Sequence, residues 1–303
     1  MSRPFRFLLS ILPIFPAAAC SDYEVQNVTS LDVFTQQEDP PADVLFVVDN
    51  SASMVEEQAN LAMNFGTFVE LLGDTTADYR IGVTTTDGAN AGRLVGPVLT
   101  PDTPDVILEF QRAVAVGTTG SRDEQGLAMG VMGVRPDVNP DFMREDAVGH
   151  VVFVSDEDDH SAEPAEYYAT ALGSAAPGEA LTAHALVGDI PAGCLSGTSA
   201  ADAGPRYLSV AETTGGLTES ICADDYAQVL VVLGLAVAGW NPTFLLSDLP
   251  AVDTLVVKVD GVEIPEREVD GWAYSIGDNA IVFAGRSIPR PGMQLTVSYQ
   301  RGG

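Results

Sequence analysis

A carboxylate and two hydroxyls occupy alternate positions at Asp49, Ser51 and Ser53, directly after an apolar run. Side chains at i, i+2 and i+4 on a loop can turn toward one point, where they offer the hard oxygen ligands that Mg²⁺, Mn²⁺ and Ca²⁺ prefer. A purely structural interpretation also fits, because Ser53 followed by Glu56 forms the capping box of a helix N-terminus.

Two distant features add to this group. Ser121 lies in a glycine-flanked stretch ahead of a predicted helix, and Asp156 ends a second apolar run. Ser121 again has a structural interpretation, since Glu124 three residues later completes a capping box. The hydroxyl of Thr118 or Thr119 is an alternative to that of Ser121.

The pattern of elements explains how these residues come together. Continuous apolar runs predict buried parallel strands, and segments with apolar residues three and four positions apart predict helices between them. We expect an α/β fold with a doubly wound, mostly parallel sheet, in which ligands bind at the carboxyl ends of the strands. The predicted strands are 43–49, 79–85, 150–156 and 181–189, and the predicted helices cover 104–115, 122–133, 164–173 and 224–239, with a further helix carrying Leu61, Phe65, Phe68 and Leu72. The apolar run 229–240 has twelve residues, which favours a buried helix over a membrane span.

The C-terminal region has a different pattern. Residues 254–264 read as two short strands around Asp260-Gly261, a strong hairpin signal. Residues 272–285 repeat this arrangement, and 294–300 supply another alternating strand. We therefore expect an α/β domain over 43–240, followed by a small antiparallel, β-sandwich-like domain over 243–303.

The N-terminal segment has the features of a targeting signal. Residues 1–19 combine two arginines, an apolar stretch and three alanines before Cys20. The sequence before Cys20 resembles a bacterial lipobox, which implies lipidation of Cys20 after cleavage. Ordinary cleavage near Cys20 is the alternative. Residues 20–42 are polar, end near two prolines and are expected to form a flexible tether.

Charge and cysteine content narrow the possibilities further. Fourteen basic and 43 acidic residues give a net charge of −29, which excludes nucleic acid and anionic membrane surfaces as electrostatic partners. Membrane contact is expected only through the lipid on Cys20. In an exported protein, Cys194 and Cys222 are predicted to form a disulfide, with two buried free thiols as the alternative.

Residues 43 to about 240 resemble a von Willebrand factor A-type domain. Asp49-x-Ser51-x-Ser53, Ser121 and Asp156 match the order of the metal-ion-dependent adhesion site of that family. The family usually has threonine where this chain has Ser121, and Thr-Asp-Gly where it has Ser155-Asp156-Glu157. Serine keeps the hydroxyl, whereas Glu157 adds a charge.

The resemblance implies a role for each residue. Ser51 and Ser53 would contact Mg²⁺, Ca²⁺ or Mn²⁺ directly, and Ser121 directly or through water. Asp49 and Asp156 would act partly through water. One coordination position would remain for an acidic residue of a protein partner, so the metal would serve recognition rather than catalysis.

The acidic run after the third predicted strand is open to two interpretations. A solvated acidic loop is one, and a second cation site that uses Glu157 or Asp158 is the other. His150 and His184 are expected to be packed or surface residues. Neither a catalytic triad nor a phosphate loop nor a zinc pattern is present in the local sequence.

These observations favour a metal-dependent binding or adhesion module, not an enzyme, anchored in the bacterial cell envelope, with the outer membrane favoured. A structural envelope lipoprotein without metal binding is one alternative. The other is an aspartyl phosphotransferase, which needs a second aspartate where this chain has Ser51.

Overall fold

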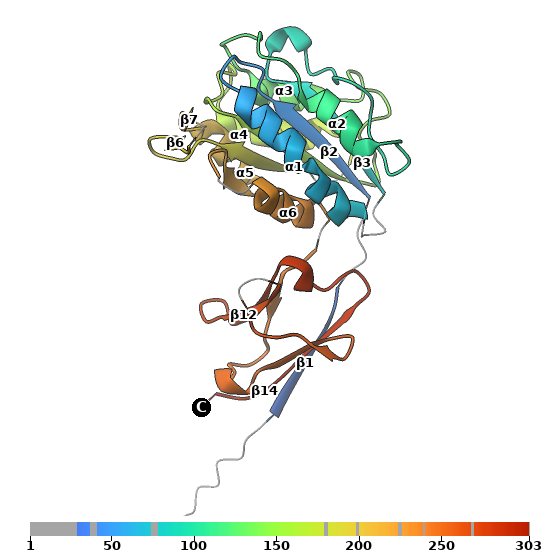
Figure 1. Cartoon of the computed structure of the whole chain (residues 1–303), viewed down its shortest axis with the longest axis vertical. Helices are drawn as coiled ribbons and strands as arrows, with labels where there is room; N and C mark the ends of the chain where they lie inside the picture. The colour runs from blue at the N-terminus through green and yellow to red at the C-terminus, as the bar shows by residue number, and fades with distance from the viewer. Residues whose placement is uncertain are drawn as a thin grey trace, which may run out of the picture.

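The structure is a computed structural model that describes residues 29–36, 41–73, 78–178, 181–197, 200–223, 226–238, 240–267 and 270–302. The expectations for residues 1–19 and Cys20 lie outside these residues. Two regions are visible in Figure 1, an α/β region with a central parallel sheet and a region built of β-strands.

The central sheet confirms the predicted fold class. Its strand order is β3-β2-β4-β5-β8, and every neighbouring pair is parallel. The strands are β2 (Ala42–Val48), β3 (Tyr79–Thr85), β4 (Val148–Ser155), β5 (Leu181–Val187) and β8 (Thr218–Ser220). The helices are α1 (Val55–Gly73), α2 (Val106–Val114), α3 (Gly126–Gly133), α4 (Ala165–Ala175), α5 (Pro205–Thr213) and α6 (Tyr226–Val237).

Strand β2 is buried along its whole length because helices cover both faces of the sheet. Phe46 belongs to a core that includes residues of α1, α2 and α6. Its neighbour Leu45 points to the opposite face and joins a core formed with α3, α4 and α5. Alternate side chains of a strand point to opposite faces, so a continuous apolar run satisfies both cores.

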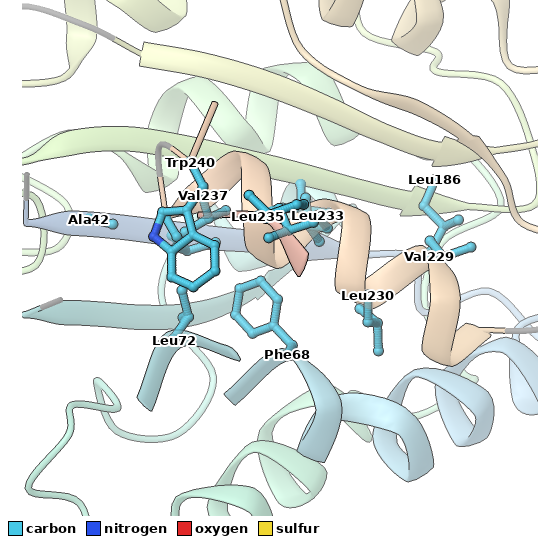
Figure 2. Close-up of a cluster of buried hydrophobic side chains, with 14 of the residues drawn as sticks. Ala42, Phe68, Leu72, Leu186, Val229, Leu230, Leu233, Leu235, Val237 and Trp240 are labelled. Carbon is cyan, nitrogen blue, oxygen red and sulfur yellow. The ribbon is translucent and has the colours of Figure 1, made fainter. Parts of the chain in front are cut away.

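Helix α1 carries the apolar face that its sequence predicts. Phe68 and Leu72 are fully buried and lie on the side of α1 that faces α6 (Figure 2). Leu230 of α6 and Trp240 lie in the same cluster. Helix α6 is thus a core helix, and within the described part of the chain no helix is long and apolar enough to cross a membrane.

The β region contains two antiparallel sheets. One has the order β1-β14-β10-β11 and the other β12-β13-β9. Its strands are β1 (Thr29–Thr35), β9 (Thr243–Leu245), β10 (Val256–Val259), β11 (Val262–Glu263), β12 (Gly271–Ser275), β13 (Ala280–Ala284) and β14 (Gln294–Gln300). Both predicted hairpins are present, with Asp260 and Gly261 at positive φ in the first turn.

Strand β1 corrects the predicted tether. Residues 29–35 were assigned to a flexible segment, but they pair with β14 over seven residues, from Thr29 with Gln300 to Thr35 with Gln294. The inward positions of β1 are stabilised by polar contacts. Ser30 donates to Asp248, and Asp32 accepts hydrogen bonds from Ser247 and Tyr299. The β region is therefore formed from both ends of the described chain.

A candidate metal centre at the carboxyl edge of the sheet

The loop after β2 places Asp49 under the edge of the sheet. Its Oδ1 accepts a hydrogen bond of 2.7 Å from the Ser51 backbone N–H, and its Oδ2 accepts one of 2.7 Å from the Ser155 hydroxyl. The side-chain amide of Gln58 donates to the carbonyl oxygens of Asp49 and Gly117, at 2.9 Å each. Asp49 is fully buried, and its carboxylate is held between the loop after β2 and the end of β4.

The side chains of Ser51 and Ser53 turn toward each other and toward the end of β4. The hydroxyls of Ser51 and Ser53 lie 3.0 Å apart, and Ser53 also hydrogen bonds with Asp156. Helix α1 begins at Val55. The structure thus brings together Asp49, Ser51, Ser53 and Asp156, four of the five residues that the sequence proposed.

The loop of residues 115–125 approaches the loop after β2 through its backbone. The Gly120 N–H donates to the Asn50 carbonyl at 2.9 Å, and a Cβ on Gly120 would overlap the Asn50 side chain. A larger residue at position 120 would therefore displace the Asn50 side chain. Ser121 follows in the loop, and its exposed hydroxyl accepts a hydrogen bond of 3.0 Å from the Asp123 N–H.

Ser121 is not the N-cap of the following helix, as the capping-box interpretation would require. Helix α3 begins at Gly126, with Gln125 in the N-cap position. The alternative hydroxyls differ in exposure, since Thr118 is half-buried and Thr119 is exposed. The structure places all three hydroxyls in the loop that contacts Asn50, next to the group around Asp49.

Asp156 has an unsatisfied oxygen. Its side chain is 3% exposed, and its Oδ1 has no hydrogen-bond partner among the described residues. Burial raises the pKa of Asp156 to about 6, with a further increase from the charges of Asp49, Glu57 and Glu157, despite the hydrogen bond from Ser53. A buried carboxylate oxygen without a donor is costly, and a cation would relieve that cost.

Burial also raises the pKa of Asp49, although hydrogen bonds from Ser155 and Ser51 oppose the change. Sequence reasoning missed a third buried acid nearby, Glu124, which it treated only as a capping partner. Burial, the Asp49 charge and the Glu157 charge raise the pKa of Glu124 to about 7. No local signal marked Glu124, because its burial depends on contacts between distant loops.

The donor set is poor in charged ligands. Within the described ranges, no group of three or more histidine, cysteine, aspartate or glutamate side chains is arranged to hold a metal ion. A cation at this edge would therefore depend on the serine hydroxyls as well as on Asp49 and Asp156. Such a site favours a hard cation and leaves it electrophilic toward a further anionic ligand.

The acidic run after β4 does not form a uniformly solvated loop. Asp159 is buried and accepts hydrogen bonds from the Leu127 N–H at 2.9 Å, from Ser161, and from Arg206 Nε at 3.1 Å. Asp158 accepts from the Arg206 backbone N–H. These two acids join the start of α3 to α5, which corrects the solvated-loop interpretation for them. Glu157 alone of the predicted accessory acids stays beside Asp49 and Asp156.

Two histidines form a buried pair away from this edge. His150 Nδ1 lies 3.1 Å from His184 Nε2, and His184 Nδ1 accepts a hydrogen bond from the Leu217 N–H. This contact requires the neutral tautomer of His184 that carries its proton on Nε2 and donates it to His150. Burial lowers the pKa of His150 to about 3 and that of His184 to about 4.

The predicted disulfide is present. Cys194 and Cys222 are bonded, with their Cα atoms 6.0 Å apart. The bond ties the short hairpin of β6 (Cys194–Leu195) and β7 (Ala200–Ala201) to the segment that follows β8. The hairpin thereby lies beside the strand end that carries Asp156, because the Asp202 N–H donates to the Asp156 carbonyl at 2.8 Å.

Comparison by sequence with protein-family models and with curated proteins gives no match. Comparison by structure finds distant similarities. Proximal thread matrix protein 1 from the mussel byssus, with a zinc-occupied MIDAS motif, is 14% identical over 71% of this chain and 51% of its own, with a TM-score of 0.42. A von Willebrand factor type A structure from Catenulispora acidiphila is 12% identical over 91% of this chain and 66% of its own (TM-score 0.40).

A third similar structure is an aerotolerance-related membrane protein from Bacteroides fragilis, 14% identical over 65% of this chain and 98% of its own (TM-score 0.41). The chain thus spans about half the length of the mussel protein and nearly all of the B. fragilis one. These similarities concern the fold, and the residues of this chain alone carry the functional argument.

Proposed function

We propose that this protein is a protein-binding module that recognises its partner through a divalent cation held at the carboxyl edge of the sheet. Asp49, Ser51, Ser53 and Asp156 would hold the cation, with Ser121 contributing from the loop of residues 115–125. The cation, Mg²⁺, Mn²⁺ or Ca²⁺, would supply a positive charge that accepts an acidic side chain of the partner. The von Willebrand factor A-type resemblance of the sequence leads to the same proposal.

The observation that carries this proposal is the Asp156 Oδ1. It is buried, has no donor among the described residues, and belongs to a carboxylate that hydrogen bonds with Ser53. Ser53 is in turn 3.0 Å from Ser51, which is anchored on Asp49. Acid and hydroxyl oxygens thus lie close together, and within the described ranges neither Asp49 nor Asp156 forms an ion pair, so a cation would supply the missing positive charge.

Phosphoryl transfer is less well supported. An aspartyl nucleophile needs a carboxylate oxygen open to the substrate. Both oxygens of Asp49 accept hydrogen bonds, one from the Ser51 N–H and one from Ser155, and the residue is fully buried. Asp49 therefore suits a supporting role at a cation better than nucleophilic attack.

Calorimetric titration of the full chain with Mg²⁺, Mn²⁺ and Ca²⁺ tests the proposal. We expect one binding event per chain with at least one of these cations, and its loss in Asp49→Ala and Asp156→Asn. The matched control is Asp146→Asn, which removes an exposed carboxylate just ahead of β4, at the opposite edge of the sheet. Absence of binding in the unaltered protein would leave a structural lipoprotein as the better account, and equal binding in all variants would place the cation elsewhere.

We further propose that the protein is attached to the bacterial envelope through lipid on Cys20, on the basis of the targeting features of residues 1–19. Expression in a Gram-negative host should place the protein in the membrane fraction, and Cys20→Ser should release it or leave it unprocessed. Membrane and soluble fractions compared by immunoblotting provide the measurement. Equal fractionation of both forms would contradict a lipid anchor.

A further inference from the structure

A groove of about 570 Å³ lies directly beside the candidate metal centre. Ser53, Asp156 and Glu157 form one side of it, and the β6–β7 hairpin forms the other. The groove is therefore lined in part by residues that would hold the cation. A volume of this size is within the usual range for ligand sites in proteins.

The hairpin wall is held in place by several independent contacts. The Cys194–Cys222 disulfide ties β6 to the segment after β8, and β6 pairs with β7. The Asp202 N–H bonds to the Asp156 carbonyl. Gly193, at a φ of 80°, passes so close to Ala201 that a Cβ would overlap the Ala201 backbone. The groove is thus formed before any ligand arrives, which lowers the entropic cost of binding.

The lining combines apolar walls with a negative rim. Ala192, Leu195 and Ala200 provide apolar surface, while Glu157 and Asp202 provide carboxylates in addition to Asp156. Among the described residues that line the groove there is neither lysine nor arginine. Asp202 is exposed, and its carboxylate has no hydrogen-bond or ion-pair partner among the described residues. The cation would neutralise charge at Asp156, whereas the carboxylate of Asp202 would remain as a negative charge in the groove.

We propose that this groove binds a lysine or arginine side chain of the partner, next to the acidic residue that reaches the cation. The aliphatic stem would lie along the apolar wall, and its charge would meet Asp202 and Glu157. A second acidic side chain would be repelled there. The inference rests on the proposed function for the acidic residue, and on the groove itself for the basic one.

Small molecules test binding of the acidic group at the cation and of the basic group in the groove separately. On protein saturated with Mg²⁺, acetate carries only the carboxylate, hexanoate adds an aliphatic chain, and 6-aminohexanoate adds an ammonium group at the far end. Pentylammonium, on metal-free protein, carries only the chain and the charge. Titrations followed by amide chemical shifts give the dissociation constants and show whether signals of Ala200 and Ala201 respond.

We expect 6-aminohexanoate to bind about three-fold or more tightly than hexanoate at low salt, a modest factor because the charge pair is partly exposed. Asp202→Asn should abolish this preference without changing Mg²⁺ affinity, whereas Asp146→Asn should preserve it. Equal affinity for the two acids, or a preference that survives Asp202→Asn, would overturn the inference while leaving Mg²⁺ binding, and the proposed function, intact.

The same titrations also show whether the metal proposal fails while the groove still binds a basic group. If Mg²⁺ does not bind but pentylammonium shifts the Ala200 and Ala201 signals in an Asp202-dependent manner, the groove is confirmed as a basic-side-chain site and the metal proposal fails. If pentylammonium leaves these signals unchanged and hexanoate binds the Mg²⁺-loaded protein more tightly than 6-aminohexanoate, the groove selects an apolar residue and the inference is wrong.

Discussion

Asp156→Asn is expected to stabilise the metal-free protein by about 1–3 kcal/mol at pH 8, because it removes a buried charge whose pKa is raised to about 6. The ordinary pKa of aspartate lies near 4, so the folded protein holds this charge at a cost at any pH above 6. As pH falls, the wild-type side chain takes up a proton and the advantage of asparagine disappears by about pH 4. Urea unfolding at pH 8, 6 and 4.5 in the presence of a chelator measures the difference.

Divalent cation should reverse the order of the two proteins. A ligand at 1,000 times its dissociation constant stabilises the native state by about 4.1 kcal/mol, and only the wild type should receive this gain. The variant should therefore be the more stable protein without Mg²⁺, and the wild type should be the more stable one with Mg²⁺. The Asp146→Asn control should follow the wild type in both conditions. A variant less stable than wild type without metal would show that Asp156 is already satisfied by its neighbours.

His150→Asn is expected to reduce the acid sensitivity of the fold. Both buried histidines are neutral in the folded protein, with pKa values of about 3 and about 4, whereas an unfolded histidine titrates near 6.5. Between those values the unfolded chain binds more protons, so stability falls as pH falls. Each histidine contributes about 1.4 kcal/mol per pH unit to this slope.

Asparagine at position 150 keeps an acceptor close to the place of His150 Nδ1, which receives the proton of His184 Nε2. The variant should lose stability at pH 7 through imperfect packing. Between pH 6 and pH 4.5, the slope of its free energy of unfolding against pH should nevertheless be smaller than that of the wild type. The difference should be about 1.4 kcal/mol per pH unit, which corresponds to one proton. Asp156 and Glu124 titrate in the same region with the opposite sign, so the difference between variant and wild type is the quantity to measure. Parallel slopes would contradict a neutral buried pair.

The sequence predicted the central sheet because its strands are buried on both faces. Runs such as 43–49 and 150–156 are apolar without interruption, a pattern that few other environments produce. The carboxyl ends of these strands placed Asp49 and Asp156 at one edge, and the structure agrees. Strand β8 was not predicted because three residues are too short for a clear period, and helix α5 was not predicted because it buries only Tyr207, Val210 and Ala211.

Strand β1 was missed for a different reason. Leu31 and Val33 are exposed, whereas Ser30 and Asp32 point inward, so its polarity is opposite to that of an ordinary surface strand. The strand is held by its pairing with β14, by the packing of Phe34 against Phe244, and by hydrogen bonds of Ser30 and Asp32 to partners more than 200 positions away. The same reason applies to the burial of Glu124 and to the Asp159–Arg206 pair, which depend on contacts between separate loops.

The course of β1 determines how tension would pass through this molecule. In the order of elements β1 is followed by β2 of the central sheet, while β10 and β11 are joined to β1 from the side through β14 (Figure 1). A pull applied to the chain ahead of Thr29, against a ligand held at the sheet edge, would travel along an already extended strand. An extended strand lengthens little under load, so the force would reach the parallel sheet along β1, while β14, β10 and β11 lie beside this path.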